Sequence, residues 1–287
     1  MNRSMISAFV SMQSIQQKLD VISHNIANVN TTGYKRREAS FQDILTNVYQ
    51  QPPGFAQAGR LTPLGFPQGW GAKIGQVEMN LAQAALISTG EPLDLGIEGN
   101  GLFEIERTSV DADGNPEIAW TRDGSFQLSY DPAVPDMMLL TTKQGERVRG
   151  IDDGPIMVPP NYSIRIDEQG FVYGTNQANP EAEPEAFGQL KVLRTLRPQV
   201  LINHGQNQFV LPPDAAVDGI LEVLDLATNN ANESTKVAVR QGFLEQSNVD
   251  LTDEMTELMT VQRAYQLNAR AITSSDTMMS LTNNLRA

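Results

Sequence analysis

The chain has 287 residues, a formal net charge of −13, an apolar content of 40% and no cysteine. The absence of cysteine excludes disulfides and thiolate metal sites, and the negative charge argues against nucleic acid, whose phosphates attract basic surfaces. No run of about 18 apolar residues is present, so we expect no membrane insertion. Ser and Gln interrupt the first residues too often for a cleavable secretory signal.

The first predicted element is a long amphipathic helix within residues 1–34. Apolar side chains recur every seven residues in two stripes, as in helices that pack on other helices. The helix is expected to end over Asn30 to Gly33, because glycine tolerates the left-handed backbone conformation, and we expect a hinge there. The predicted helix-packing residues are Met5, Met12, Ile15, Leu19, Ile22, Ile26 and Val29, with Asn25 and Asn28 as compact hydrogen-bonding groups beside them. A helix buried in a globular core would show the same period.

An extended segment is expected over residues 35–75. Residues 48–72 are rich in Pro, Gly and Gln, and their scattered apolar side chains have no local core. We expect this segment to bridge to neighbouring subunits through Phe55, Leu61, Phe66 and Trp70.

Residues 76–241 are expected to form a β-rich domain. Short β-prone runs alternate with Asp-Gly, Asn-Gly and Gln-Gly pairs, which are typical of hairpins. No helix-length period separates the runs, so an antiparallel sheet is favoured over a parallel α/β sheet.

A second long amphipathic helix is expected within residues 242–287. Side chains from Ser247 to Glu254 provide caps and first-turn acids. The predicted packing residues are Leu251, Leu258, Val261, Tyr265, Ile272 and Met279. The predicted fold class is therefore α+β, with long N- and C-terminal amphipathic helices forming a coiled-coil inner domain and a central antiparallel β-rich domain.

The sequence offers no clear catalytic, cofactor or metal site. The only histidines, His24 and His204, fall on an outward helix position and in a predicted turn. Glu104, Glu106 and Asp111 form the nearest cluster of carboxylates, as a muramidase would need, but they fit the face of a hairpin. We expect no enzyme, no cofactor and no metal.

Three stretches resemble the axial proteins of the bacterial flagellum, which form its rod and hook. QQKLDVISHNIANVNTTGYKR (Gln16–Arg36) is similar to their N-terminal motif, and the stretch from Gly242 to Arg286, with SNVDL and QRAYQLNA, to their C-terminal motif. PLDLGIEGNGLFEI and WTRDGSFQLS resemble the signature of their β domain. Two departures are His24, where the family usually has Asn, and Tyr34, where Phe is common. The chain length and the segment from Phe41 to Gly75 resemble the distal rod type and the hook-basal-body proteins of Gram-positive bacteria.

The resemblance implies a structural subunit of the flagellar basal-body rod that polymerises helically with itself. Its other implied partners are further rod and hook proteins and the flagellar type III export apparatus, which would pass the chain across the cytoplasmic membrane without a cleavable signal. A proximal rod or hook subunit is an alternative within the family. A trimeric surface or phage-tail-like binding protein would also explain heptads that flank a β domain.

Two expectations concern the isolated subunit. Residues 1–35 and 250–287 should be disordered in the monomer and become ordered on assembly, because an isolated amphipathic helix has no partner for its apolar face. Deletion of Gly242–Ala287 should abolish polymerisation and leave the β domain folded.

Overall fold

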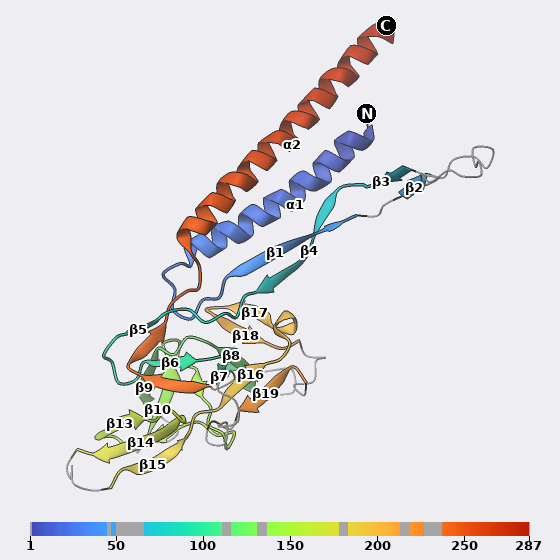
Figure 1. Ribbon diagram of the computed structural model, residues 1–287. Helices are drawn as coiled ribbons and strands as arrows, with labels where there is room; N and C mark the ends of the chain where they lie inside the picture. Colours follow the sequence, from blue (N-terminus) through green and yellow to red (C-terminus); the bar gives the residue numbers. More distant parts are fainter. Residues whose placement is uncertain are drawn as a thin grey trace, which may run out of the picture. The chain divides into compact units, whose positions relative to one another are not determined.

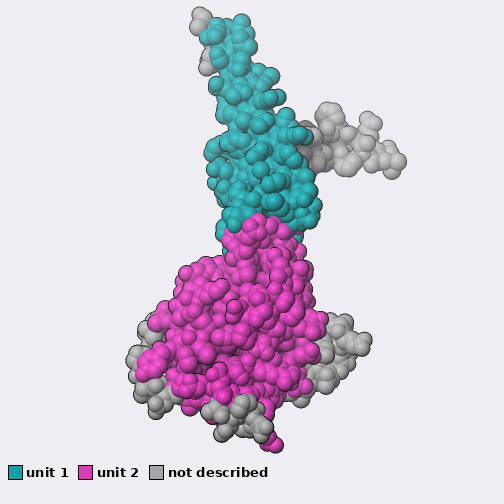
Figure 2. Space-filling view, turned by 90° about the vertical axis from the view of Figure 1, so that its left-hand side faces the viewer, with its two compact units in different colours: residues 1–27, 37–78, 250–287 teal, residues 28–36, 79–249 magenta. Residues whose placement is uncertain are grey.

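The computed structural model describes residues 2–44, 47–49, 66–110, 116–130, 137–177, 183–212, 219–224, 226 and 237–286 (Figure 1). The chain divides into two compact units, coloured separately in Figure 2. The helical unit comprises Met1–Ala27, Arg37–Glu78 and Asp250–Ala287, and the central unit comprises Asn28–Arg36 and Met79–Val249. Each unit is therefore built from segments that are far apart in the sequence.

Two long helices dominate the helical unit. Helix α1 (Asn2–Ala27) and helix α2 (Leu251–Arg286) lie side by side and run in opposite directions (Figure 1). With 26 and 36 residues, they are about 39 and 54 Å long at 1.5 Å per residue. The C-terminal end of α2 consequently extends beyond the N-terminal end of α1.

The start of α2 is capped by Asp250. Its Oδ1 accepts hydrogen bonds from the backbone N–H groups of Thr252, at 2.8 Å, and Asp253, at 3.3 Å. These bonds lower the pKa of Asp250 below its ordinary value. The cap satisfies two of the N–H groups that the first helical turn leaves without partners.

Helix α1 ends earlier than the sequence suggested. The last helical residue is Ala27, and the chain turns immediately, with the N–H of Thr31 bonded to the carbonyl of Asn28 at 3.1 Å. Val29 and Asn30 therefore lie beyond the helix, and the prediction that the helix continues to Asn30–Gly33 is wrong. The heptad pattern of the sequence extends past the end of the helix, although Val29 belongs to the segment that joins the central unit.

Two short antiparallel pairings complete the helical unit. Strand β1 (Arg37–Asp43) pairs with β4 (Ala72–Met79), and β2 (Asn47–Tyr49) pairs with β3 (Phe66–Gln68). Helix α1 packs on β1. The expected extended segment over 35–75 thus includes ladders at both of its ends, whereas Phe55 and Leu61 lie outside the described residues.

The central unit is a set of antiparallel sheets. Its largest sheet has ten strands, in the order β12-β10-β11-β7-β8-β18-β17, with β9 beside β10, β16 beside β7, and β19 beside β16. The strands of this sheet are β7 (Leu102–Val110), β8 (Pro116–Thr121), β9 (Phe126–Tyr130), β10 (Met138–Thr142), β11 (Arg147–Val148), β12 (Met157–Val158), β16 (Val192–Thr195), β17 (Ile202–Gly205), β18 (Gln208–Val210) and β19 (Leu221–Leu224).

Three smaller sheets and a short helix complete the unit. One sheet has the order β13-β14-β15, and the others are the pairs β20–β6 and β21–β5. Their strands are β5 (Leu86–Ser88), β6 (Leu95–Glu98), β13 (Tyr162–Ile166), β14 (Phe171–Asn176), β15 (Glu185–Gln189), β20 (Ala238–Gln241) and β21 (Phe243–Glu245), and the 3₁₀ helix is η2 (Pro198–Val200).

One main hydrophobic core holds these sheets together. Phe103 is fully buried, and its ring meets that of Phe126 edge-on with centroids 5.1 Å apart, a favoured geometry for aromatic pairs. Leu95 and Ile97 of β6 and Val239 of β20 belong to the same core. The last strands before α2 are therefore an internal part of the central unit.

The predicted α+β class, with a β-rich centre and a long helix at each end, is confirmed. The division into units differs from the boundaries expected at residues 34, 75 and 241, because residues 28–36 and 242–249 both join the central unit.

Candidate assembly site

Most of the predicted packing residues lie on the half-buried faces of the two helices. Ile22 and Val261 are buried, and Leu251 is the exception, since 39% of it is exposed. The half-buried residues are Met5, Met12, Ile15, Leu19, Ile26, Leu258, Tyr265, Ile272 and Met279. The ammonium group of Lys18 and the carboxylate of Glu257 form an ion pair at 2.5 Å that joins α1 to α2.

Helix α1 also contacts the strands of its own unit through polar groups. The hydroxyl of Ser14 is buried and donates a hydrogen bond to the carbonyl of Ala72 at 2.8 Å. The Lys18 ammonium lies over the ring of Phe41, 5.4 Å from its centroid. The inward side of α1 therefore meets both α2 and the β1–β4 pair.

Asn25 has a different place from the one expected. It is 1% exposed, and its Nδ2 donates to the Arg37 carbonyl at 2.9 Å and to Glu254 Oε2 at 3.3 Å. Its Oδ1 accepts a bond from the Arg37 N–H at 3.0 Å. Because these bonds join α1, β1 and α2 of one chain, Asn25 is buried within the subunit and does not offer its amide to a neighbouring subunit. Asn28 lies in the turn after α1, where its Oδ1 accepts from the Thr31 hydroxyl.

Large apolar side chains remain exposed along both helices. Phe9 is 57% and Leu285 89% exposed. The exposed set consists of Ile6, Phe9, Leu251, Met255, Met259, Leu267, Met278, Leu281 and Leu285. At 100° per residue, Leu267, Met278, Leu281 and Leu285 fall within about 60° of one another around α2. They form one stripe, which we call the distal stripe.

A buried ionic centre lies in the central unit and consists of Lys35, Arg122 and Glu245. All three side chains are 2% exposed or less. The Lys35 ammonium pairs with Glu245 Oε1 at 2.9 Å, and the Arg122 Nε–H donates to Glu245 Oε2. The remaining Arg122 donors bind the carbonyls of Ile97, Gly99 and Gly101. The glycine-rich stretch GIEGNGL (Gly96–Leu102) thus supplies the backbone carbonyls that bind the guanidinium group of Arg122.

Gly33 brings the entering chain against this centre. Its φ of +68° is in the left-handed region, and its N–H donates to the Glu245 carbonyl at 2.8 Å. A Cβ at this position would lie 2.6 Å from the backbone nitrogen of Asp123. Gly33 is therefore held within the central unit by close backbone contacts rather than ending α1, and these contacts argue against a hinge at this glycine.

The charges of the ionic centre shift the pKa values of its members. Burial alone would raise the pKa of Glu245, but Arg122 and Lys35 together lower it below the usual 4.5. The pKa of Lys35 is also lowered, first by burial and then by the nearby Arg122 charge, against the opposing effect of Glu245. The two directions agree physically, because two cations share one carboxylate.

Asn248 connects three segments of the central unit. Its Oδ1 accepts from the Arg36 N–H at 2.7 Å, and its Nδ2 donates to the carbonyls of Asn80, at 2.9 Å, and Ala82, at 3.1 Å. The ionic centre and Asn248 were not predicted from the sequence. Their signal was present in the stretches NTTGYKR, WTRDGS and GFLEQSN, each of which places a charged or amide side chain among small or apolar neighbours.

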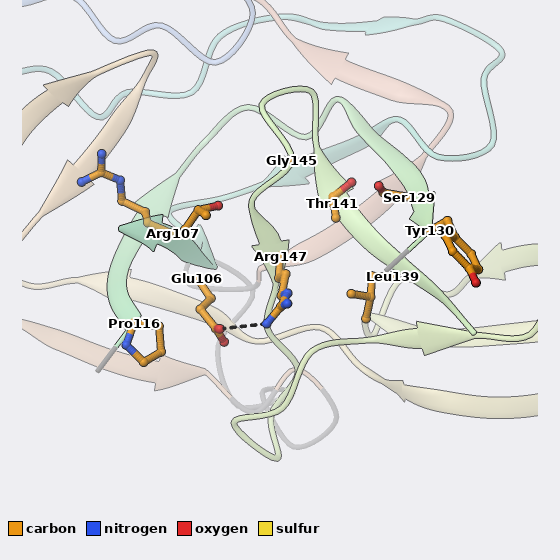
Figure 3. A pocket seen from close by; sticks show the side chains of 10 residues that line it. Glu106, Arg107, Pro116, Ser129, Tyr130, Leu139, Thr141, Gly145 and Arg147 are labelled. Atoms are coloured by element: carbon orange, nitrogen blue, oxygen red, sulfur yellow. Dashed lines mark hydrogen bonds and ion pairs between the residues drawn. The ribbon is translucent and has the colours of Figure 1, made fainter. Parts of the chain in front are cut away.

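Two of the three carboxylates considered for catalysis, Glu104 and Glu106, form ion pairs. Glu104 is buried and pairs with Arg149 at 2.9 Å and Lys191 at 3.1 Å. Glu106 pairs with Arg147 at 3.5 Å at the edge of a hollow of about 450 Å³ (Figure 3). Asp111 lies outside the described residues. Partnered carboxylates of this kind are typical of structural ion pairs rather than of an acid–base pair at a glycosidic bond.

The described residues offer neither a metal site nor a membrane-spanning helix. Over the described ranges, no group of three or more His, Cys, Asp or Glu side chains is arranged to hold a metal ion. Neither of the two long helices, over their described residues, has an apolar stretch sufficient to cross a membrane.

Three protein-family models match the sequence. The model described as flagella basal body rod protein matches residues 11–35, and that of the flagellar hook protein FlgE/F/G D1 domain matches residues 96–174. The model described as flagellar basal body rod FlgEFG protein C-terminal matches residues 240–285. Each of the three matched regions supplies one member of the ionic centre.

Curated relatives match over the whole chain. The chain is 33% identical to the flagellar basal-body rod protein FlgG of Borreliella burgdorferi, covering 100% of this chain and 99% of that protein. The chain belongs to the flagellar basal-body rod protein family. It is also 32% identical to FlgG and 30% identical to the flagellar hook-basal body complex protein FlhP, both of Bacillus subtilis, with full coverage of both chains in each case. This rod protein is a structural subunit of the distal rod type, located in the flagellar basal body.

Proposed function

We propose that this rod protein polymerises with copies of itself into a hollow helical rod. The terminal helices of neighbouring copies form a coiled-coil inner layer, and the central unit forms the outer part. A heterologous contact whose rotation does not close generates an open helical filament rather than a ring. Such a filament, if rigid, transmits torque between the motor and the hook.

The observation that carries this proposal is the apolar surface of the helices. Phe9 and the distal stripe are exposed within the subunit, and residues 4–17 of α1 have no charged side chain. Burial of one exposed Leu contributes about 1.5–3 kcal/mol. Over residues 4–17, this surface of apolar and neutral polar side chains suits a second copy of the same helices, because no desolvated charge opposes the contact there.

The remaining partners follow from the names of the relatives. Several relatives are named as basal-body rod proteins and one as a hook-basal body complex protein, which supports contacts with other rod and hook proteins at the two ends of the polymer. We propose further that the chain reaches the rod unfolded through the flagellar type III export apparatus, and that its role is structural and not enzymatic.

The segment around residues 50–75 has a separate proposed role. We propose that it bridges to neighbouring subunits through Phe55, Leu61, Phe66 and Trp70, and so stiffens the rod. Trp70 is half-buried, and its backbone N–H donates to the Ile44 carbonyl at 3.3 Å. This hydrogen bond holds the C-terminal part of the segment within the helical unit, which supports the proposed role.

Polymerisation of the purified chain tests the proposal. We expect Leu267→Gln/Leu281→Gln to raise the critical concentration for filament formation by at least about tenfold, since two apolar contacts are lost. Ser280→Gln, an exposed change on the same helix, is the matched control and should polymerise normally. Electron microscopy and pelleting give the readout. Normal filaments from the double variant, or a discrete trimer from the unchanged chain, would contradict a helical polymer built on these helices.

A further inference from the structure

The ionic centre has an unusual charge balance. Two cations, Lys35 and Arg122, share the single carboxylate of Glu245, and all three side chains are buried. The other hydrogen bonds of the two cations go to backbone carbonyls. Lys35 donates to Ala82, and Arg122 donates to Ile97, Gly99 and Gly101. Carbonyl dipoles stabilise the two buried cations but do not neutralise their charge.

The carboxylate comes from a part of the chain that is far from both cations in the sequence. Glu245 is 210 residues from Lys35 and 123 residues from Arg122. Its strand, β21, pairs with β5, and the preceding β20 pairs with β6, whose Leu95 and Ile97 belong to the main core. The Glu245 carboxylate also accepts a bond from the Ala84 N–H through Oε1, and the Glu245 backbone carbonyl accepts one from the Gly33 N–H. Glu245, which lies on strand β21, therefore connects residues 33–35 and Arg122 to that strand.

We propose that Glu245 closes the central unit: until β21 supplies this carboxylate, the buried Lys35 and Arg122 keep the unit from folding. A chain that ends before residue 245 has both cations and no counter-ion, so its folded state is strongly disfavoured. The closing role rests only on the contacts within the central unit. One consequence does rest on the proposed export. A chain that passes through the export channel N-terminus first would keep its central unit unfolded until nearly all of the chain has left the channel.

Equilibrium unfolding of the full chain tests this role. The chain has two tryptophans, so Trp70→Phe leaves the buried Trp120 as the fluorescent probe of the central unit. In this background we expect Glu245→Gln to lower the folding equilibrium constant about 100-fold or more, because it leaves buried cations without a counter-ion. Glu98→Gln is the control, since the Glu98–Arg240 pair has the same 2.9 Å separation but is half exposed. Its effect should be less than about fivefold.

A second variant separates charge balance from packing. Lys35→Met removes one of the two cations, so Glu245→Gln should cost at least about tenfold less in the Lys35→Met chain than in the Lys35 chain. If Glu245→Gln alone does not fold, recovery of a folded unit in the Lys35→Met/Glu245→Gln chain supports the closing role. Equal losses in both backgrounds, a Glu245→Gln effect no larger than that of Glu98→Gln, or failure of the double variant to fold would overturn it. The unassembled chain is measured throughout, so the result does not depend on polymerisation.

Discussion

At the scale of single residues, Glu245 shows how a carboxylate can stabilise a fold in a pH-dependent way. Its pKa is lower in the folded chain than the usual 4.5, because Arg122 and Lys35 outweigh the effect of burial. A carboxylate of this kind stabilises the folded state fully above about pH 4.5, and this contribution is lost as the pH falls through the folded-state pKa.

We therefore predict that acid unfolding of the central unit depends on Glu245. From pH 7 to pH 3, the urea midpoint of the Trp70→Phe chain should decrease. In the Glu245→Gln variant of this chain the midpoint should decrease less, because one titrating group has been removed. Fluorescence of Trp120 in urea titrations at each pH gives the measurement. Glu98→Gln should keep the slope of the unchanged chain. The same slope in Glu245→Gln as in the Trp70→Phe parent would contradict the assignment.

Gly33 gives a second prediction at this scale. Gly33→Ala should lower the free energy of unfolding of the central unit by more than about 1 kcal/mol, since φ is positive and the new Cβ would meet Asp123 backbone atoms. Gly145→Ala is a suitable control, because its φ is also positive but no atom lies within 4 Å of the added Cβ. Similar losses in both variants would show that the close approach at Gly33 has no energetic consequence beyond its backbone angle.

At the scale of elements, the heptad stripes and hairpin signals were sufficient to predict two terminal helices and an antiparallel β-rich centre. Periodicity could not locate the end of α1, because Val29 continues the heptad pattern although it belongs to the central unit. The three stretches that hold Lys35, Arg122 and Glu245 could be noticed in the sequence, but their meeting in one ionic centre could not be predicted, since it arises only through tertiary folding. The short strands β20 and β21 look like an approach to α2, but their pairing with β6 and β5 makes them part of the central unit.

These boundaries change the expected effect of a C-terminal deletion. Removal of residues 242–287 takes away β21 and Glu245, so the central unit should lose its folded state, contrary to the expectation from sequence. Removal of residues 251–287 deletes only α2 and should leave the central unit protected while it abolishes polymerisation. Limited proteolysis and Trp120 fluorescence of the two truncated chains provide the comparison. A folded central unit in both chains would contradict the assignment of residues 242–249 to that unit.

The position at which α1 ends also changes the expectation for order in the monomer. We predict that α1 and α2 exchange their amide hydrogens rapidly in a dilute monomer and slowly in the polymer, because their exposed apolar faces are covered only on assembly. Residues 31–36 should be protected in both states, since Tyr34 and Lys35 are buried in the central unit. The earlier expectation of disorder up to residue 35 is therefore revised to Ala27. Helix amides that are already protected in the dilute monomer would count against ordering on assembly.

At the scale of the whole molecule, the chain combines a self-contained β-rich unit with a helical unit whose two helices leave large apolar side chains exposed. This combination is consistent with a rod subunit, in which one unit folds alone and the other is completed by neighbours. The bridging segment makes a further prediction. Replacement of residues 52–64 by a short Gly/Ser linker keeps the β2–β3 pair and Trp70, and it should yield polymers that bend more readily in electron micrographs. Polymers with unchanged stiffness would exclude the bridging role.

The most direct measurement is electron microscopy of basal bodies from a strain that lacks this chain. A distal rod subunit predicts a stub that ends part-way along the rod and bears no hook, with full-length rods restored by the unchanged chain but not by Leu267→Gln/Leu281→Gln. A complete rod with an attached hook in the deletion strain would contradict the assignment of this protein to the rod.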